Sequence, residues 1–227
     1  MCGYYGFLVN VWQARVGEVL RPIAPEIAQQ PLEQHYTRRL NKGLIRFREG
    51  EYVMQDAYWW YQLKRDSATG NFVPDYKLTT FNARNLSSDY WSKAFRTRRG
   101  IVVASQIGES EGSERFLMQA SEPLYLAALY QDWTNKNGSK VSSYAIITRP
   151  PHPRFAEYHS KSTPLMLPAD SELLSAWMAP EPLPSGLADE LSANAVLRAD
   201  LSVTPVKTYA RAEPLGDTRK LARDICR

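Results

Sequence analysis

The sequence predicts an α+β fold, a single domain in which mostly antiparallel β-sheets form a barrel-like core flanked by short helices. The chain has 227 residues, of which 44% are hydrophobic and 11% aromatic, and this supplies enough material for one sizeable core. Strand-like runs occur in groups with helices between the groups, without regular strand–helix alternation. We therefore expect residues 1–227 to form one domain, with a peripheral tail over about residues 211–227.

The first half of the chain predicts two helical regions and two strands. Residues 16–40 contain helical patches interrupted by three prolines, which predicts one or two short helices. Residues 51–63 are rich in Tyr, Trp and Val, which is typical of a strand. A Ser-Ser pair can cap a helix over about residues 89–97, and the apolar run at residues 100–107 predicts the next strand.

The second half of the chain begins with strands and ends with helices. Three apolar runs predict strands at residues 115–119, 123–130 and 141–148, and the Asn-Gly pair before the last of them is a strong turn signal. The remaining elements are expected in this order: a short helix that follows prolines and ends near His159, a buried strand at residues 165–167, and helices at residues 171–178 and 187–198.

Cys2 is the most informative residue, because removal of Met1 would make it the N-terminal residue. It would then carry an α-amine and a thiol, which together condense with an aldehyde, first as a Schiff base and then as a five-membered thiazolidine. The amine has an ordinary pKa of about 8 and the thiol one of about 8.5, so both nucleophiles are partly available near neutrality. Gly3 and the apolar, β-prone run after it predict an N-terminus held in a structured site.

Composition and charge narrow the classes of function. Lys and Arg number 28 against 24 for Asp and Glu, a mild excess, but basic residues gather with aromatic ones at residues 36–48 and 91–99. Each run is either a solvated face or a phosphate contact. The spacing of Cys2 and Cys226 favours neither a disulfide framework nor a zinc site, so we expect no metal or other cofactor. No apolar stretch or leader pattern indicates a membrane, which predicts a cytoplasmic protein.

Several motifs follow one another along almost the whole chain: Met1-Cys2-Gly3, Asn82-Ala83-Arg84, and the segments at residues 98–104, 126–133, 143–148 with His159, and 201–209. In this order and spacing they resemble the SOS response-associated peptidase family. Members of that family sense abasic sites in single-stranded DNA and become covalently attached to them. The resemblance also implies a self-processing peptidase activity, in which the same cysteine removes the protein's own leading residue or prosegment once, in cis, and a lyase-type activity on abasic DNA at the same site.

The resemblance assigns a role to five residues. Cys2 would be the nucleophile, Asn82 would form a hydrogen bond near it, and Arg84 would hold a DNA phosphate with its planar fork of donors. Glu109 would be the acid/base carboxylate, and His159 would handle the sugar oxygen during ring opening. An abasic deoxyribose is mostly a closed hemiacetal, so a proton must be moved to free its aldehyde, and a carboxyl group and an imidazole are the usual agents.

The chain departs from the family's pattern at these positions. Tyr4 stands where the family usually has Arg, which removes one expected phosphate contact. The aromatic residues that normally flank the catalytic glutamate are replaced around Glu109, and a two-residue shift would make Glu111 its equivalent. The sequence therefore leaves the choice between Glu109 and Glu111 open, and loss of the DNA function with retention of the fold stays an alternative.

Further candidates for DNA contact are two tryptophans and two arginines. Trp59 and Trp60 could stack on unpaired bases, although aromatic residues in strands are more often part of the core. Arg98 and Arg99 belong to the second basic run. We expect a monomer whose partner is single-stranded DNA with abasic sites. Two alternatives stay open: an N-terminal-nucleophile cysteine hydrolase that cleaves a peptide or amide, and a non-catalytic nucleic-acid-binding module on the same fold.

Overall fold

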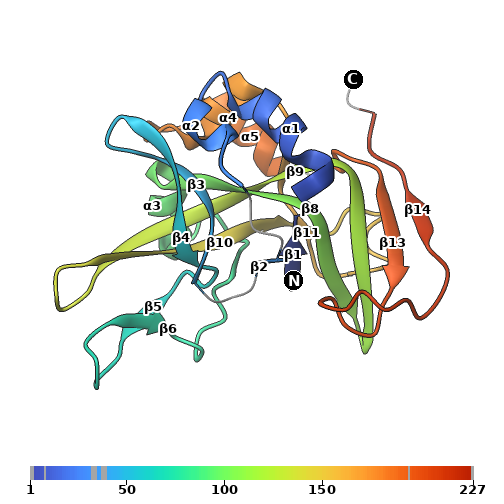
Figure 1. Ribbon diagram of the computed structural model, residues 1–227, viewed down its shortest axis with the longest axis horizontal. Helices are drawn as coiled ribbons and strands as arrows, with labels where there is room; N and C mark the ends of the chain where they lie inside the picture. The colour runs from blue at the N-terminus through green and yellow to red at the C-terminus, as the bar shows by residue number, and fades with distance from the viewer. Residues whose placement is uncertain (1–2, 8, 32–34, 37–39, 194, 226–227) are drawn as a thin grey trace.

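The computed structural model describes residues 3–7, 9–31, 35–36, 40–193 and 195–225. Its centre is a ring of strands that lie around one hydrophobic interior (Figure 1). In ring order the strands are β3 (Leu40–Arg48), β4 (Glu51–Tyr58), β10 (Lys140–Arg149), β9 (Glu114–Thr134) and β8 (Arg99–Glu111). Neighbours pair antiparallel except β4 and β10, which run parallel, and the pairing of β8 with β3 closes the ring.

The other elements extend or cover this ring. Strands added to it are β1 (Tyr4–Gly6), β2 (His35–Tyr36), β7 (Asn82–Ala83), β11 (Thr163–Pro164), β12 (Met166–Leu167), β13 (Leu201–Pro205) and β14 (Arg219–Leu221), while β5 (Leu63–Arg65) and β6 (Phe72–Pro74) form a separate hairpin. The helices are α1 (Val9–Leu20), α2 (Pro25–Ala28), α3 (Asp89–Thr97), α4 (Ser171–Met178) and α5 (Ser185–Ala193). Figure 1 shows α1, α2, α4 and α5 gathered at one end of the ring.

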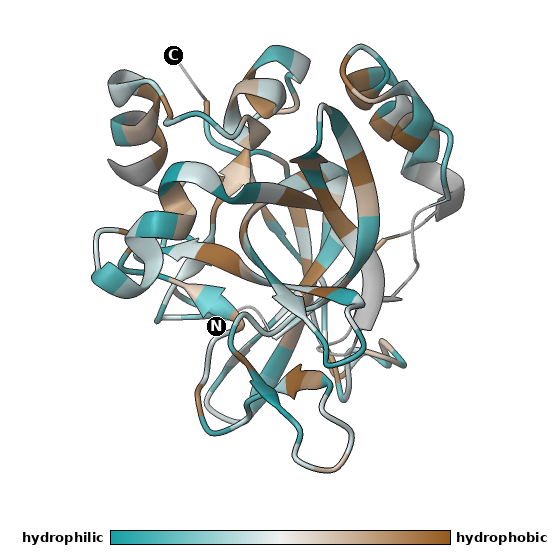
Figure 2. Cartoon of the chain, turned by 90° about the vertical axis from the view of Figure 1, so that its left-hand side faces the viewer, coloured by the Kyte–Doolittle hydropathy of each residue, from teal (hydrophilic) through white to brown (hydrophobic). Residues whose placement is uncertain are grey.

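Strand β8 is the central element, because it is buried from Arg99 to Glu109. Its crossing with β3 is close enough to require glycine: a Cβ at Gly100 would lie 2.7 Å from the carbonyl oxygen of Ile45. Helix α4 packs on the same point, where the indole nitrogen of Trp177 donates to the Gly100 carbonyl at 2.9 Å. Figure 2 shows hydrophobic segments concentrated on the central strands and hydrophilic segments around them.

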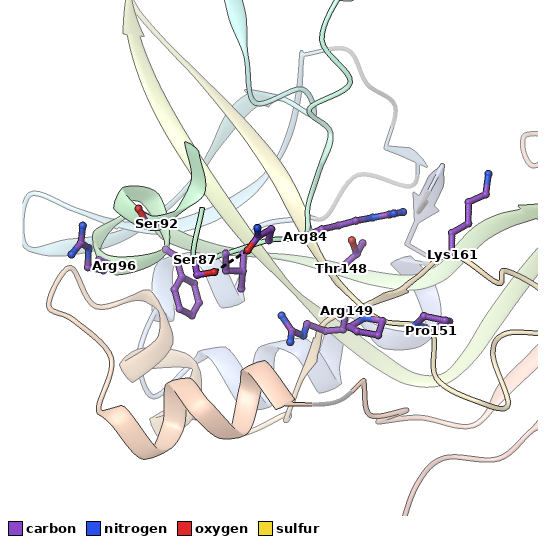
Figure 3. Close-up of a pocket in the computed structure, with 12 residues that line it drawn as sticks. Arg84, Ser87, Ser92, Arg96, Thr148, Arg149, Pro151 and Lys161 are labelled. Atoms are coloured by element: carbon purple, nitrogen blue, oxygen red, sulfur yellow. Dashed lines mark hydrogen bonds between the residues drawn. The ribbon is translucent and has the colours of Figure 1, made fainter. Parts of the chain in front are cut away.

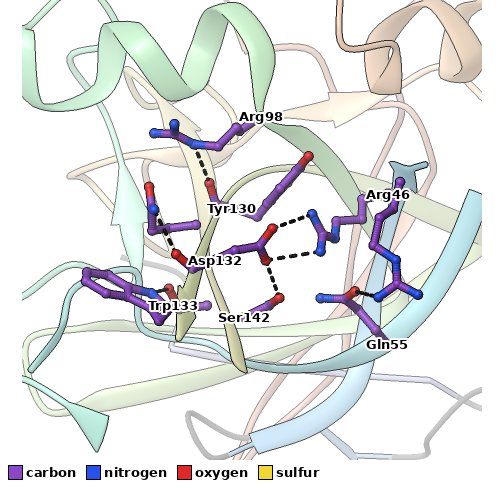
Figure 4. Close-up of polar contacts among 10 residues, drawn as sticks. Arg46, Gln55, Arg98, Tyr130, Asp132, Trp133 and Ser142 are labelled. Carbon is purple, nitrogen blue, oxygen red and sulfur yellow. Dashed lines mark hydrogen bonds and ion pairs between the residues drawn. The ribbon is translucent and has the colours of Figure 1, made fainter. Parts of the chain in front are cut away.

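A polar network ties the strands together at another part of the ring (Figure 4). The Arg46 guanidinium donates to both carboxylate oxygens of Asp132, at 2.9 and 3.0 Å, and lies over the ring of Tyr130. Ser142 donates to the same carboxylate at 2.5 Å. Because Arg46 is buried, the bidentate pairing satisfies a charge that would otherwise be costly to remove from water.

The α+β class with mostly antiparallel sheet is confirmed, and so are the elements with strong local signals. Helix α3 covers the predicted residues with Ser88 at its N-cap position, and α4 begins after Asp170, whose side chain accepts from the Leu173 amide at 2.8 Å. The predicted turn at Asn137-Gly138 joins β9 to β10, with Gly138 at a φ of 82°. The predicted peripheral tail contributes β14, which pairs with β13.

Three local predictions are wrong. The helix expected at residues 187–198 is α5, which covers Ser185–Ala193 and ends five residues earlier. The runs at residues 115–119 and 123–130 are not separate strands, because β9 continues through both and changes its partners along the way, from β13 to β12 and β10. The short helix expected before His159 is absent from the described residues. In its place, the carbonyls of His152 and Phe155 each accept two amides, which makes isolated turns that lead the chain into β11. The described helices include none long and apolar enough to cross a bilayer.

Candidate functional site

Glu109, Glu111 and His159 lie together where the end of β8 meets the loop before β11. Two pockets lie there, of about 960 and 620 Å³. Arg84, Arg96 and Arg149 line the larger pocket, Gly3, His159 and Tyr209 line the smaller one, and Lys161 lines both. We refer to them below as the basic pocket and the histidine pocket.

Glu109 is fully buried on β8 and lies next to His159. Burial raises the pKa of its carboxyl group to about 8, against a smaller opposing effect from the positive charge of Arg84. One carboxyl oxygen lies 3.9 Å from Nδ1 of His159. A carboxyl group with such a pKa holds its proton at neutral pH, which is what a general acid requires.

His159 is positioned by the backbone of β8. Its Nδ1 lies 2.8 Å from the carbonyl oxygen of Ser110, an acceptor, so we assign a proton to Nδ1. Nε2 is buried and has no hydrogen-bond partner within the described parts of the chain. In the neutral imidazole this arrangement leaves the Nε2 lone pair available to accept a proton.

Glu111 occupies the same face of β8 as Glu109, because side chains two residues apart on a strand point the same way. Its carboxylate accepts from the backbone amide of Ser160 at 2.7 Å and from the Ser160 hydroxyl at 2.9 Å, and these hydrogen bonds lower its pKa. Glu111 therefore stays ionised and anchors the residue next to His159. The surroundings raise the pKa of Glu109 and lower that of Glu111, so the two carboxyl groups are suited to different roles.

Pairing between β1 and β8 brings the start of the described chain to the same place. Tyr4 lies opposite Gly108, and the amide of Gly3 donates to the Gly108 carbonyl at 3.2 Å. Gly3 thus lines the histidine pocket together with His159. The predicted nucleophile, Cys2, lies outside the described residues.

Asn82 and Arg84 reach the site through β7, a short strand that runs parallel to β10. Asn82 is buried opposite Ile146, whereas Arg84 is exposed and donates to the hydroxyl of buried Ser162 at 3.2 Å. This contact joins β7 to the loop that carries His159. Asn82 and Arg84 therefore lie on the side of the site where that loop ends.

The basic pocket concentrates positive charge (Figure 3). Arg84, Arg96, Arg149 and Lys161 line it, and the described lining residues include no carboxylate. Apolar side chains, among them Leu86 and Phe95, also line it. A pocket of this composition favours a ligand with several negative charges and apolar surface, such as a segment of nucleic acid.

Four residues predicted to contact DNA form hydrogen bonds within the fold. Trp59 is fully buried and donates to the Phe81 carbonyl, and Trp60, 6% exposed, donates to the Asp75 carbonyl. Both rings pack in the core. A DNA base could stack on them only if their ring faces were exposed, and in this structure other side chains cover those faces.

Arg99 is also buried, and its guanidinium donates to five backbone carbonyls, those of Phe95, Arg96, Trp177, Ala179 and Glu181. Arg98 donates to the Tyr130 carbonyl and the Tyr61 hydroxyl. The two arginines thus hold α3 against the sheet and α4, and buried Arg99 is not placed to meet a phosphate.

Three residues of the site were not singled out from the sequence. Arg149 and Lys161 enter the basic pocket from either side of a proline-rich loop, and Tyr209 enters the histidine pocket from the segment after β13. Their distances along the chain follow no spacing rule that would connect them to Arg84 or His159. Only the folding of the proline-rich loop and of the segment after β13 brings them there.

Fold and site together define an α+β protein in which an acid and an imidazole meet beside a cationic pocket. The chain belongs to the SOS response associated peptidase family, whose model matches residues 1–211. A search of curated proteins finds no match.

Solved structures share the fold. A protein from Bacteroides thetaiotaomicron superposes with a TM-score of 0.62 at 16% identity, over 91% of this chain and 93% of that one. A protein from Bordetella bronchiseptica gives 0.58 at 20% identity, over 91% and 100%. A phage-related protein from the same bacterium gives 0.59 at 16% identity, over 95% and 100%. At these identities the likeness concerns the fold alone.

Proposed function

We propose that this protein captures abasic sites in single-stranded DNA by forming a covalent thiazolidine through Cys2 after Met1 is removed. The observation that carries the proposal is the buried carboxyl group of Glu109, whose pKa is raised to about 8, lying 3.9 Å from His159. The pocket beside this pair also contains Gly3, the residue that follows Cys2. Membership of a family associated with the SOS response supports a substrate connected with DNA damage.

The chemistry begins with opening of the sugar ring. The closed hemiacetal loses the proton of its C1′ hydroxyl to Nε2 of His159, while the protonated carboxyl group of Glu109 donates to the ring oxygen. The ring C–O bond breaks and the C1′ aldehyde forms. Glu109 is then ionised and His159 protonated, so the pair can return these protons to later intermediates.

The second stage joins the protein to the sugar. The α-amine of Cys2 adds to the C1′ aldehyde, and loss of one water gives a Schiff base. The Cys2 thiolate then adds to the imine carbon, and the imine nitrogen takes up a proton, which closes the five-membered ring. The sum is one aminothiol plus one aldehyde giving one thiazolidine and one water. The buried side chain of Asn82 orders the approach of Cys2.

DNA is held by the basic pocket in this proposal. Arg84, Arg96, Arg149 and Lys161 contact phosphates of the strand, which positions the lesion without reading sequence. We assign the peptidase chemistry named for the family to a single event in cis, the removal of the protein's own leading residue by Cys2.

The test mixes the purified protein with an oligonucleotide that contains one abasic site and measures the products by intact mass. The expected product has the mass of the chain without Met1 plus the DNA, less one water. Cys2→Ala removes it, and the matched variant Cys226→Ala, which changes the other cysteine of the chain, leaves it in place. An adduct that survives Cys2→Ala rejects the proposal.

The same preparation separates the alternatives. Repeated turnover of a small peptide or amide without DNA supports the cysteine hydrolase. DNA binding that falls with salt but never becomes covalent, and that is indifferent to Cys2→Ala, supports the non-catalytic binding module.

A further inference from the structure

We propose that Tyr209 forms a stacking platform in the histidine pocket for the DNA base next to the abasic site. This inference rests on the proposed function and names a contact that the capture chemistry does not itself require. An abasic sugar offers no base, so a protein that holds it gains affinity from the neighbouring nucleotide. The structure supplies an aromatic ring at that place.

Tyr209 lies on a rigid support. Its ring stacks on that of Tyr4, with centroids 5.4 Å apart and planes inclined by 20°. Tyr4 is buried, and its hydroxyl accepts from the side-chain amide of Gln106 at 3.0 Å. Since Tyr209 is part-exposed, the surface that this aromatic pair presents to the histidine pocket belongs to Tyr209.

A glycine at position 108 makes this placement possible. A Cβ on Gly108 would lie 2.7 Å from Cδ1 and 2.8 Å from Cε1 of Tyr209, distances that side chains essentially never show. The ring of Tyr209 thus occupies the space that a side chain at position 108 would fill, one residue before Glu109. Because consecutive side chains on a strand point to opposite faces, this ring lies on the face of β8 opposite Glu109, and it shares the lining of the histidine pocket with His159.

The rest of the histidine pocket suits one nucleotide. Arg115 and Lys161 supply exposed cations for its phosphates, and Ser113 adds a hydroxyl. The volume of about 620 Å³ lies within the range of pockets that hold small organic ligands. An aromatic ring with flanking cations is the combination by which proteins hold unpaired bases without reading their sequence.

The experiment measures equilibrium binding by fluorescence anisotropy in the Cys2→Ala protein, which removes the proposed crosslinking nucleophile. The probe is an oligonucleotide with one tetrahydrofuran residue, a stable abasic analogue. A second probe also has tetrahydrofuran in place of the two adjacent nucleosides, so that it lacks the neighbouring bases. We expect Tyr209→Leu to weaken binding of the first probe on the order of tenfold and to leave binding of the second unchanged.

Two further variants and a control sharpen the result. Tyr209→Phe retains the ring and should bind both probes like the parent. Gly108→Ala displaces the ring while leaving Tyr209 in the sequence, and should reproduce the loss on the first probe alone. Tyr76→Leu removes a tyrosine that is 67% exposed and lines neither pocket, and should change nothing.

Equal losses on both probes, or none on either, overturn the platform, and so does an absence of binding in the parent protein. The proposed function fails by a different measurement, the absence of a covalent adduct between the native chain and a true abasic site. A chain that makes no adduct, yet binds the first probe in a Tyr209-dependent way, retains the platform and loses the capture chemistry.

Discussion

Replacement of Glu109 by glutamine should change how the stability of the protein depends on pH. The carboxyl group is fully buried and its pKa is raised to about 8 from an ordinary value of 4.5. Between these values the folded chain holds a proton that the unfolded chain has released, so the free energy of unfolding falls as pH rises. The stabilisation that the protonated Glu109 contributes is fully present below about pH 4.5 and is lost progressively as the pH rises to about 8.

The size of the effect follows from the shift. Each pKa unit corresponds to about 1.4 kcal/mol, so the move from 4.5 to about 8 costs the wild-type protein about 5 kcal/mol across this interval. Glutamine has nearly the same shape and does not ionise. The difference in unfolding free energy between Glu109→Gln and wild type should therefore move in favour of the variant by about 5 kcal/mol between pH 4.5 and 8.5.

Urea denaturation of both proteins at half-unit steps of pH measures this difference directly, because all other titrating groups are common to the two chains. Glu111→Gln is the matched control. Hydrogen bonds from Ser160 lower the pKa of Glu111, so its contribution is present above the unfolded pKa and is lost as pH falls through the folded one. Parallel curves for wild type and Glu109→Gln would refute the reasoning about Glu109.

Three other substitutions test the remaining parts of the structure. Glu111→Ala removes both hydrogen bonds to Ser160 and should slow adduct formation about tenfold without changing DNA affinity. A time course of crosslinking measures this rate, and Glu111→Gln should recover it in part. A wild-type rate in Glu111→Ala contradicts the prediction. Arg99→Met leaves several carbonyls without their donor and should lower the free energy of unfolding by about 3 kcal/mol, so unchanged urea denaturation counts against it. Arg84→Met should weaken binding to single-stranded DNA, and loss of one phosphate contact should reduce the magnitude of the slope of log affinity against log salt concentration by about 0.7. An unchanged slope would exclude a phosphate contact by Arg84.

Elements whose signals are local could be predicted from the sequence. Helices α3 and α4 have an N-cap residue and a compact apolar pattern within their own length, and their bounds agree with the expectation. The sequence predicts two strands where the structure has the single strand β9, because the middle of this segment is polar and contains Pro123. Its continuity depends on partners distant in sequence, since β13 and β12 pair with successive parts of it.

The site could be predicted only in part, for the same reason. The resemblance indicated Glu109, His159, Asn82 and Arg84. In the structure Glu109 lies 3.9 Å from His159 and near enough to Arg84 for that charge to influence its carboxyl group, whereas Asn82 is placed by its pairing with β10. Tyr209 could not be predicted, because its position depends on contacts with Tyr4 and Gly108 across about two hundred and one hundred residues. These contacts also give a structural role to Tyr4, which the sequence marked as the loss of an expected arginine.

The choice between Glu109 and Glu111 shows why environment must be known before chemistry is assigned. Two residues apart on one strand, the carboxyl groups lie 3.9 and 4.0 Å from the same imidazole nitrogen, so neither spacing nor distance separates them. Burial separates them, since Glu109 is fully enclosed while Glu111 is part-exposed and held by Ser160. Of the two, only the enclosed group keeps a proton at neutral pH, and a proton donor is what the proposed opening of the sugar ring requires. The ionised group can orient the histidine loop, because an anion that is already hydrogen-bonded twice holds its partner without taking part in proton transfer.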